Sequence, residues 1–382
     1  MKRIAVVYPL LSSYLLPVLQ GIADSGGVLL DVLYSPPPPG TGFGEHLPFE
    51  HSNVKWIEVE ERQPFGNTIG MSQKGIAKYL YTTQPDAILI WANPRYVSFW
   101  GVLLVARLFG IPVYPRGHGL FKKTKVSLLH RIMYKVIVGL SKRYICYTPQ
   151  VKESLLRISI PEEKLAVDYN SLYVSHPVPS EERTGDEKGI LFIGRLRQLC
   201  GIELLIEAAT IVHKNFDLDL HIIGEGIKSE YVQEIASQSI WINYHGMVYS
   251  EEKIREISRL CRFGCQPGYT GLSVVHLMGL SLPVIVHGDP HAQMGPEPEY
   301  ILHGSNGYMY GNQGDVGSLA RALEEMLNLS SKKMKLLQER SFHTYSKLNF
   351  PPYHERLLAI LEGGAGEELP LHEVTSEEII NM

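Results

Sequence analysis

Short apolar runs alternate with stretches of helical apolar periodicity through the first 150 residues. The runs predict strands at 4–8, 29–34, 87–91, 112–114 and 144–147, and the periodic stretches predict helices at 17–23, 75–81, 100–109 and 127–140. Strands that alternate with helices are typical of a parallel sheet with helices on both faces. Residues 36–53, which include four consecutive prolines, predict a long surface loop.

A polar, proline-bearing stretch at 174–188 interrupts this pattern and predicts a linker. The alternation then restarts, with strands expected at 190–193, 218–223, 240–245, 263–266 and 283–287 and helices at 201–213, 228–237, 251–260, 274–280 and 316–327. We therefore predict an α/β fold of two Rossmann-like, doubly wound domains, residues 1–173 and 189–345, that face a central cleft. Open α/β sheets bind ligands at the carboxyl ends of their strands, so the cleft is the expected site.

Composition and charge narrow the classes of protein and partner. A formal net charge of −4 over 382 residues argues against a nucleic-acid partner. No apolar run is long enough to predict a membrane span, and the chain enters a strand directly after Met1, without the pattern of a signal peptide. Cys261 and Cys265 lie four positions apart, which suits one helix face as well as a metal site, but no second pair of ligands accompanies them. We therefore expect reduced thiols and no metal. We expect a cytoplasmic protein, whose location extends to the inner face of the plasma membrane.

One turn in the second half carries a chemical signal. Gly271, Leu272 and Ser273 precede an apolar helix that Pro283 ends. The first N–H groups of a helix have no partner within the helix, and the helix dipole makes that end electropositive. Such a turn suits a phosphate, which indicates a ligand of the nucleotide type.

Four segments in order resemble the C-terminal domain of family 4 glycosyltransferases of the GT-B fold. They are residues 192–196 (Phe-Ile-Gly-Arg-Leu), 222–226 (Ile-Ile-Gly-Glu-Gly), 244–248 (Tyr-His-Gly-Met-Val) and 267–286 with 298–307. The first half is similar through Arg116-Gly117-His118-Gly119. The sequence also resembles a subset of the family that is typical of bacterial surface-polysaccharide synthesis. The residues that match this subset are Pro267, Gly268, Gly271, Leu272, His276, Gln293 and Met294.

The resemblance implies a retaining glycosyltransferase (EC 2.4 class) that moves a hexosyl or related sugar from a nucleotide-sugar donor. The acceptor would be a glycan or a lipid-linked sugar in surface polysaccharide synthesis. The nucleotide-diphosphate sugar is a substrate, and no cofactor or metal is expected. The resemblance also implies that a C-terminal segment, 346–362, returns to the first domain, with 353–361 after Pro351-Pro352 as the candidate helix. Residues 363–382 are predicted to be a disordered tail.

The resemblance also places the site residues. His118 and Arg195 are the predicted catalytic residues, because His118 would face the donor sugar and the Arg195 guanidinium suits the charge that develops on the diphosphate. The predicted donor-binding residues are Gly194, Arg195, Arg197, Met247, Gly271, Leu272, Ser273, His276, Glu297 and Glu299. The sequence departs from the family at Gly268 and His276, where the family has glutamates, and at Cys200, where it has lysine.

Residues 122–143 are basic and contain no acid. Apolar residues interleave with the lysines and arginines at helical spacing, which fits either a peripheral contact with an anionic membrane or a core stripe with solvated lysines. Three functions stay open at this stage. They are the transferase, a catalytically weak GT-B protein that binds a nucleotide sugar or partners an active transferase, and a GT-B-like sugar-nucleotide epimerase.

Overall fold

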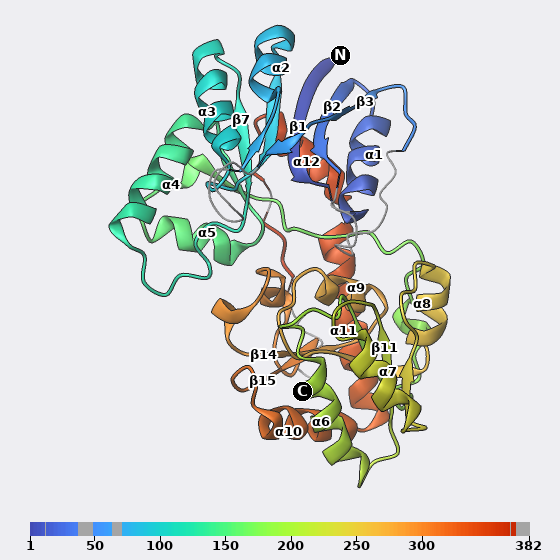
Figure 1. Ribbon diagram of the computed structural model, residues 1–382. Helices are drawn as coiled ribbons and strands as arrows, with labels where there is room; N and C mark the ends of the chain where they lie inside the picture. The colour runs from blue at the N-terminus through green and yellow to red at the C-terminus, as the bar shows by residue number, and fades with distance from the viewer. Residues whose placement is uncertain (12, 37–48, 63–70, 367, 372–382) are drawn as a thin grey trace. The chain divides into compact units, whose positions relative to one another are not determined.

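The computed structural model describes residues 1–11, 13–36, 49–62, 71–366 and 368–371. The chain divides into two compact units (Figure 1). The N-terminal unit comprises Met1–Asn170 with Pro351–Glu368, and the C-terminal unit comprises Ser171–Phe350 with the described residues after Glu368. Each unit contains one parallel sheet, which confirms the predicted α/β class. The cleft between the domains stays a prediction.

In the described part of the N-terminal unit, seven parallel strands form one sheet. Their order is β3 (Val54–Glu58), β2 (Val28–Ser35), β1 (Lys2–Leu10), β6 (Ala87–Trp91), β7 (Val113–Gly117), β8 (Tyr144–Cys146) and β9 (Leu165–Val167). A short antiparallel pair, β4 (Glu61–Arg62) and β5 (Ser72–Gln73), lies outside it. The helices are α1 (Leu16–Asp24), α2 (Ile76–Thr83), α3 (Val97–Phe109), α4 (Leu128–Leu140), α5 (Pro149–Leu156) and α12 (Tyr353–Leu361).

The N-terminal sheet is covered by helices because its central strands are apolar on both faces. Ala5, Val7 and Ile88 pack with side chains of α2, α3 and α4 in one core cluster. Local signals mark both ends of the helices. The Ser127 hydroxyl accepts from the His130 N–H at the start of α4, and Gly110 adopts a left-handed conformation directly after the end of α3.

The predicted C-terminal segment 346–362 contains the end of α11 (Ser331–Asn349), which belongs to the C-terminal unit, and then α12. The bounds of α12 are those of the candidate helix 353–361, and α12 packs against α1 in the N-terminal unit. Pro351 and Pro352 separate the two helices because proline lacks the N–H that a continuous helix needs. In the predicted tail, the Gly363 carbonyl accepts from Arg143 Nη1 at 3.1 Å. Residues 367 and 372–382 of that tail lie outside the described residues.

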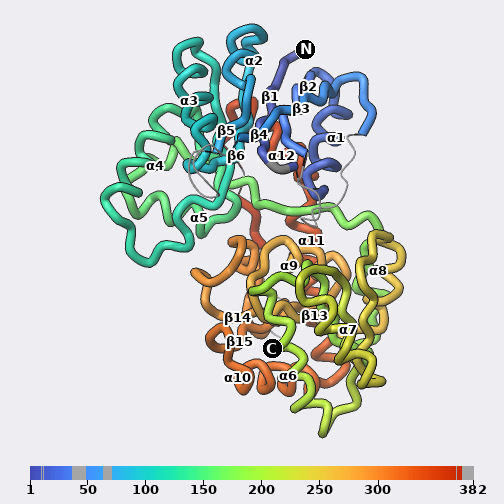
Figure 2. Tube along the Cα trace, viewed as in Figure 1, coloured from blue at the N-terminus to red at the C-terminus, as the bar shows by residue number. Residues whose placement is uncertain are grey.

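In the C-terminal unit, six parallel strands form the described sheet. Their order is β12 (Ile242–Tyr244), β11 (Asp219–Ile223), β10 (Gly189–Ile193), β13 (Cys261–Gln266), β14 (Val284–His287) and β15 (Gly307–Tyr310). The helices are α6 (Ile202–His213), α7 (Ser229–Ser237), α8 (Glu251–Ser258), α9 (Ser273–Gly279), α10 (Val316–Leu327) and α11. Helices α6 and α10 lie side by side in both views (Figures 1 and 2).

The strand order of this sheet reverses at β10. The chain runs outward from β10 through β11 to β12 and then returns to β13 on the other side of β10. Loops that leave the two sides of such a point diverge at the carboxyl edge and leave a crevice there. The segments after β10 and β13 are therefore the first place to look for a ligand site.

Residues 174–188, predicted as a linker, belong to the C-terminal unit. The Val178 N–H donates to the Gly279 carbonyl at 3.1 Å. The buried Arg183 guanidinium donates to the carbonyls of Ser258 and Cys261 at 2.8 and 3.1 Å. A polar sequence suggested solvent exposure, but these backbone carbonyls pair with the buried guanidinium and fix the segment to the domain.

Candidate functional site

Three loops interlock at the carboxyl edge of the C-terminal sheet. The Gly194 N–H donates to the Ile223 carbonyl at 3.0 Å, and the Gly224 N–H donates to the Gly246 carbonyl at 2.8 Å. Gly224 has a φ of +139°, and a Cβ there would lie 1.9 Å from the Gly194 carbonyl oxygen. Only glycine allows this approach, so the Gly-x-Gly segment holds the loop after β10 in place.

Arg195 and Arg197 project from that loop. Burial lowers the pKa of Arg195 to about 10, and the positive charge of Arg197 adds to the shift. Burial also lowers the pKa of Arg197, whose Nη1 lies 3.0 Å from the Met294 sulfur. Both guanidiniums stay charged at neutral pH, so the half-buried Arg195 and the exposed Arg197 place two positive charges close together. An anion bound between them would relieve their repulsion, and guanidinium forks match phosphate oxygens.

The turn after β13 is fixed by the loop after β14. The Thr270 carbonyl accepts from the N–H groups of Met294 and Gly295 at 3.0 Å each. The Gln293 side chain accepts from the Thr270 N–H at 3.4 Å and donates to the His287 carbonyl at 3.1 Å. Met294, which contacts Arg197, is thus held beside Gly271. The structure brings the predicted Arg197 and Gly271 to the same place, and it adds Met294 to the site.

The helix that follows this turn is short. Helix α9 has seven residues, which is about two turns, and the Val274 N–H already donates to the Gly271 carbonyl. The Ser273 hydroxyl pairs with the Thr270 hydroxyl at 2.6 Å. A helix this short has a small dipole, so attraction of a phosphate here would come mainly from Arg195 and Arg197.

Glu297 is buried, and its carboxylate lies against this turn. Oε2 lies 3.1 Å from the point that a Cβ on Gly271 would occupy and 2.0 Å from the corresponding point on Gly295. The short 3-10 helix Glu297–Tyr300 places Glu299 in a half-buried position next to it. The carboxylate predicted at Glu297 is therefore at the turn that carries Gly271 and Leu272.

His276 has a partner that the sequence did not reveal. Its Nε2 lies 3.3 Å from Glu251 Oε2, which comes from the start of α8. Burial alone would raise the pKa of Glu251, but the hydrogen bond and charge of His276 lower it. The glutamate that the family has at this position of α9 is replaced by a histidine that holds a carboxylate from α8.

Met247 follows the aromatic-x-Gly turn after β12. Its backbone N–H donates to Glu225 Oε1 at 3.4 Å, which ties this turn to the loop after β11. The predicted residue Met247 therefore lies at the same sheet edge as Gly194 and Arg195.

His118 lies in the N-terminal unit, directly after β7. Its ring packs at 4.7 Å from the Tyr147 ring and at 5.9 Å from the Phe121 ring, measured between centroids. Burial first, and then the charges of Lys122 and Arg116, lower the pKa of His118 to about 4. The imidazole is therefore neutral at pH 7 and has one hydrogen-bond donor and one acceptor.

Gly268 stands where the resembled family has a glutamate, and backbone atoms surround it. A Cβ there would lie 2.4 Å from the Leu199 carbonyl oxygen and 2.5 Å from the Cys200 carbonyl carbon. The Tyr269 N–H also donates to the Leu199 carbonyl at 2.8 Å. No side chain fits at position 268 unless the 199–201 backbone moves, so the family's glutamate cannot be accommodated in this arrangement.

We predict that Gly268→Ala destabilises the protein by about 1–3 kcal/mol, because overpacking forces the backbone to shift. Urea unfolding followed by circular dichroism measures the effect. Gly139→Ala is the matched control, since a Cβ at Gly139 in α4 meets no atom within 4 Å. Alanine is favoured over glycine in a helix by up to about 1 kcal/mol, so the control should gain stability. Equal midpoints for Gly268→Ala and the wild-type chain would contradict the packing argument.

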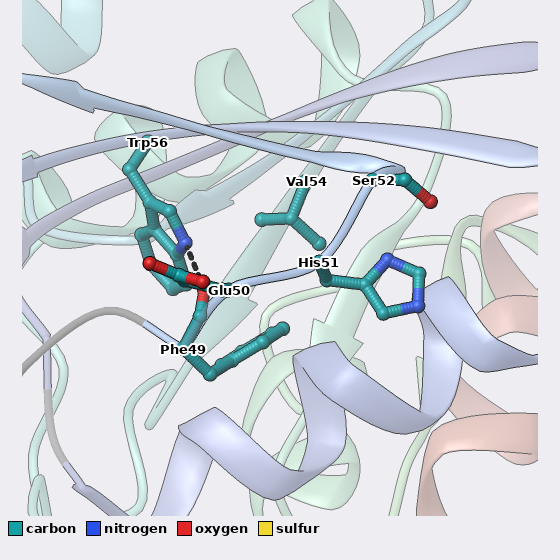
Figure 3. Close-up of a pocket in the computed structure, with 6 residues that line it drawn as sticks. All are labelled: Phe49, Glu50, His51, Ser52, Val54 and Trp56. Carbon is teal, nitrogen blue, oxygen red and sulfur yellow. Dashed lines mark hydrogen bonds between the residues drawn. The ribbon is translucent and has the colours of Figure 1, made fainter.

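A pocket of about 560 Å³ lies in the N-terminal unit at the amino end of β3 (Figure 3). Its lining residues are Phe49, Glu50, His51, Ser52, Val54 and Trp56. The Trp56 indole N–H donates to the Phe49 carbonyl at 2.9 Å, and the two rings meet edge to face. None of the predicted site residues lines this pocket, which lies at the opposite sheet edge from His118.

Within the described ranges, no three His, Cys, Asp or Glu side chains gather as a group that could hold a metal ion. The cysteines Cys146, Cys200, Cys261 and Cys265 are all buried and form no disulfide. Burial raises the pKa of the Cys200 thiol.

Residues 187–329 match the family model described as glycosyl transferases group 1. No curated protein sequence matches the chain. The architecture is similar to that of a glycosyltransferase from Rickettsia africae, with 16% identity, a TM-score of 0.68, and coverage of 94% of this chain and 98% of that chain.

Two further solved structures extend the comparison. The Anabaena protein HepE in complex with UDP is 15% identical, with a TM-score of 0.67 and coverage of 95% of this chain and 100% of that chain. TarM of S. aureus, in complex with UDP and sugar ligands, is 12% identical, with a TM-score of 0.66 and coverage of 95% and 100%. At these identities the likeness shows the fold. The chain has an α/β fold with parallel sheets that matches GT-B glycosyltransferase structures, and a segment of its second half, residues 187–329, is similar to the group 1 glycosyl transferases model.

Proposed function

We propose that the chain is a retaining glycosyltransferase of the family 4 type. It would move a hexosyl or related sugar from a nucleotide-diphosphate sugar to a glycan or lipid-linked acceptor in surface polysaccharide synthesis. The observation that carries the proposal is a pair of neighbouring guanidiniums, the half-buried Arg195 and the exposed Arg197, on the loop after β10. This loop lies within the segment that matches the group 1 glycosyl transferases model.

The chemistry needs positive charge where the leaving group departs. As the bond between the sugar C1 and the diphosphate oxygen breaks, negative charge grows on the phosphate, and Arg195 and Arg197 stabilise it. The acceptor oxygen bonds to C1 on the same face, and its proton passes to the departing phosphate oxygen. Neutral His118 contacts the donor sugar without adding charge. This route retains the anomeric configuration, and the two arginines provide the charge balance without a metal.

Glu297 favours this proposal over a catalytically weak binding protein. The substitution of Gly268 removes one family carboxylate, but the Glu297 carboxylate lies at the Gly271 turn. Carboxylates pair well with sugar hydroxyls, so the pocket keeps an acceptor for the donor sugar. The loss at position 268 is therefore no reason to expect an inactive site.

A panel of nucleoside diphosphates and nucleotide sugars tests the donor site. We expect one donor to raise the melting temperature in a concentration-dependent way, because a ligand present at 100 times its Kd adds about 2.7 kcal/mol to the stability of the native state. Nucleoside monophosphates should shift it less, since they carry a single phosphate between the two arginines. The donor that binds is then offered with candidate acceptors, and the anomeric configuration of the product is read by NMR. A panel in which no diphosphate stabilises the protein would remove the proposed site.

The surface of α4 fits a peripheral contact with an anionic membrane. Leu128, Leu129, Ile132 and Val136 are exposed, at 72, 73, 52 and 44% of their surfaces, whereas the helix packs through Tyr134, Ile137 and Val138. The interpretation of the whole apolar stripe as core is thus wrong for these four residues. Helix α3, which contacts α4, also exposes Leu104 and Leu108.

The positive charge around α4 indicates that the partner of this surface is negatively charged. Residues 87–152 contain no Asp or Glu, and Lys122, Lys123 and Lys125 are exposed beside the start of α4. Exposed apolar side chains flanked by lysines suit the interface of a bilayer with anionic lipids. No helix among the described residues has the length and apolar character to cross a bilayer. We propose that this surface holds the enzyme at the inner face of the plasma membrane, where a lipid-linked acceptor would be available.

A further inference from the structure

A fully buried arginine organises the carboxyl edge of the N-terminal sheet. Arg116 in β7 has no exposed surface. Its Nε donates to Asp168 Oδ2 at 2.5 Å, and its Nη2 donates to Asn170 Oδ1 at 2.6 Å. Nη1 donates to the Tyr8 hydroxyl at 3.2 Å. Burial works to lower the pKa of Arg116, but Asp168 and the surrounding tyrosines raise it well above its usual value, so it is a cation.

The C-terminal helix completes this network. Tyr353 is the first residue of α12 and is fully buried. Its hydroxyl accepts from Arg116 Nη2 and donates to Asp168 Oδ2 at 2.9 Å. Asp168 Oδ1 has no hydrogen-bond partner within the described part of the chain. Asp168 therefore depends on Arg116 and Tyr353 for its two hydrogen bonds, both through Oδ2.

The network reaches His118 through one aromatic ring. The Arg116 guanidinium carbon lies 4.2 Å from the centroid of the Tyr147 ring, in a cation–π contact. The His118 ring also packs against the Tyr147 ring, at 4.7 Å between centroids. The backbone beside His118 is fixed, because the Gly119 N–H donates to the Tyr144 hydroxyl at 3.2 Å and the Gly119 carbonyl accepts from the Tyr134 hydroxyl at 2.8 Å. The remaining freedom of His118 is rotation of its side chain, which packing against the Tyr147 ring restrains.

We propose that Tyr353 is a positioning residue for His118. Through Asp168 and Arg116 it fixes the Tyr147 ring, and the Tyr147 ring fixes the imidazole in the orientation that donor chemistry requires. This makes correct docking of α12 on the N-terminal unit a condition for turnover. The inference rests on the proposed function in one respect, namely that His118 contacts the donor sugar.

Loss of the Tyr353 hydroxyl disturbs the network for a physical reason. Asp168 would keep one hydrogen bond, and Arg116 would lose an acceptor, in surroundings without exposed surface. Buried charged groups that lose partners rearrange to regain them, because their desolvation is costly. A shift of the Arg116 guanidinium moves the ring stacked on it, and misplacement of a catalytic group by about 1 Å can lower a rate by about 100-fold.

The test uses Tyr353→Phe in the full chain, which keeps the ring and removes only the hydroxyl. Histidine-selective NMR, with His118 assigned from His118→Gln, should show shifted His118 ring resonances. With the donor that the panel identifies, kcat should fall by about tenfold to 100-fold, while donor Kd stays within twofold because the residues proposed to hold the nucleotide diphosphate, Arg195 and Arg197, are untouched. Tyr79→Phe is the matched control, since it also removes a tyrosine hydroxyl from a buried carboxylate, Asp31, of the same unit. It should leave the His118 resonances and kcat unchanged.

A second variant covers the case in which Tyr353→Phe does not fold. Tyr147→Leu removes the ring between Arg116 and His118 and should shift the His118 resonances in the same way. Unchanged resonances in the folded variants would overturn the proposal, and so would shifted resonances with an unchanged kcat. If the resonances shift but the wild-type chain transfers no sugar from any donor, the coupling stands and the proposed function fails.

Discussion

Arg195→Ala should lower kcat by about 10²–10³, the largest effect expected for any single residue of the site. The guanidinium is half-buried next to Arg197, so it is already desolvated and placed before a donor binds. A preorganised charge of this kind acts where charge develops and needs no rearrangement during the reaction. Initial rates of nucleotide release at saturating donor and acceptor measure the effect.

Two further variants test whether the effect is specific to the Arg195 guanidinium. Arg195→Lys keeps the charge but loses the planar fork, so it should recover only part of the rate. Arg321→Ala removes an exposed arginine from α10 of the same unit and should leave kcat unchanged. If Arg195→Ala kept kcat within twofold of the wild type, the diphosphate would have to be held elsewhere.

Replacing Lys122, Lys123 and Lys125 together by glutamine should weaken binding to anionic vesicles by roughly 100-fold. Each basic side chain near such a surface contributes about 1 kcal/mol, and three of them amount to about 3 kcal/mol. Flotation with vesicles of phosphatidylcholine containing 30% phosphatidylglycerol (roughly the range in which surface charge matters) measures binding at low and high salt. The wild-type chain should float at low salt and be released at high salt, because salt screens exposed charges.

The control for this experiment comes from the other unit. Helix α11 carries Lys332, Lys333 and Lys335, and the same triple change to glutamine there removes equal charge away from α4. It should leave flotation unchanged. Ile132→Ser tests the apolar contribution of α4 and should weaken binding without altering its salt dependence. Equal binding of the wild-type chain to neutral and anionic vesicles would contradict the proposed surface.

Local pattern predicted most of the sheet strands, and the ones it missed have a weak local signal. The predicted strands at 4–8, 87–91 and 190–193 are confirmed within β1, β6 and β10. Strand β3 was placed in no predicted element, because its alternation of apolar and polar residues covers only five positions at the sheet edge. Such a strand is defined by its hydrogen bonds to β2, which the sequence does not display.

The site divides in the same way. Arg195 and Arg197 were predicted from the resemblance of their segment to family 4 glycosyltransferases, and Gly271 from that resemblance and from its place before an apolar helix. Their loops follow apolar strands, and the carboxyl edge of a parallel sheet collects such loops. Glu251 was not predicted, because it stands among ordinary acidic residues at the start of a helix and becomes notable only at 3.3 Å from His276. Met294 likewise becomes a site residue only through its contact with Arg197.

Local sequence alone specified the alternation of strands and helices, the positions of the loop glycines and the basic stretch without acids. Each of these features depends only on residues that are close together in the chain. The contacts of Tyr353 with Arg116, of Glu297 with the Gly271 turn and of Gly268 with the Leu199–Cys200 backbone were decided by tertiary structure alone. The partners in these contacts are far apart in the chain, and Arg116 and Tyr353 are separated by 237 positions. Local propensity carries no information about which distant residues will pack together.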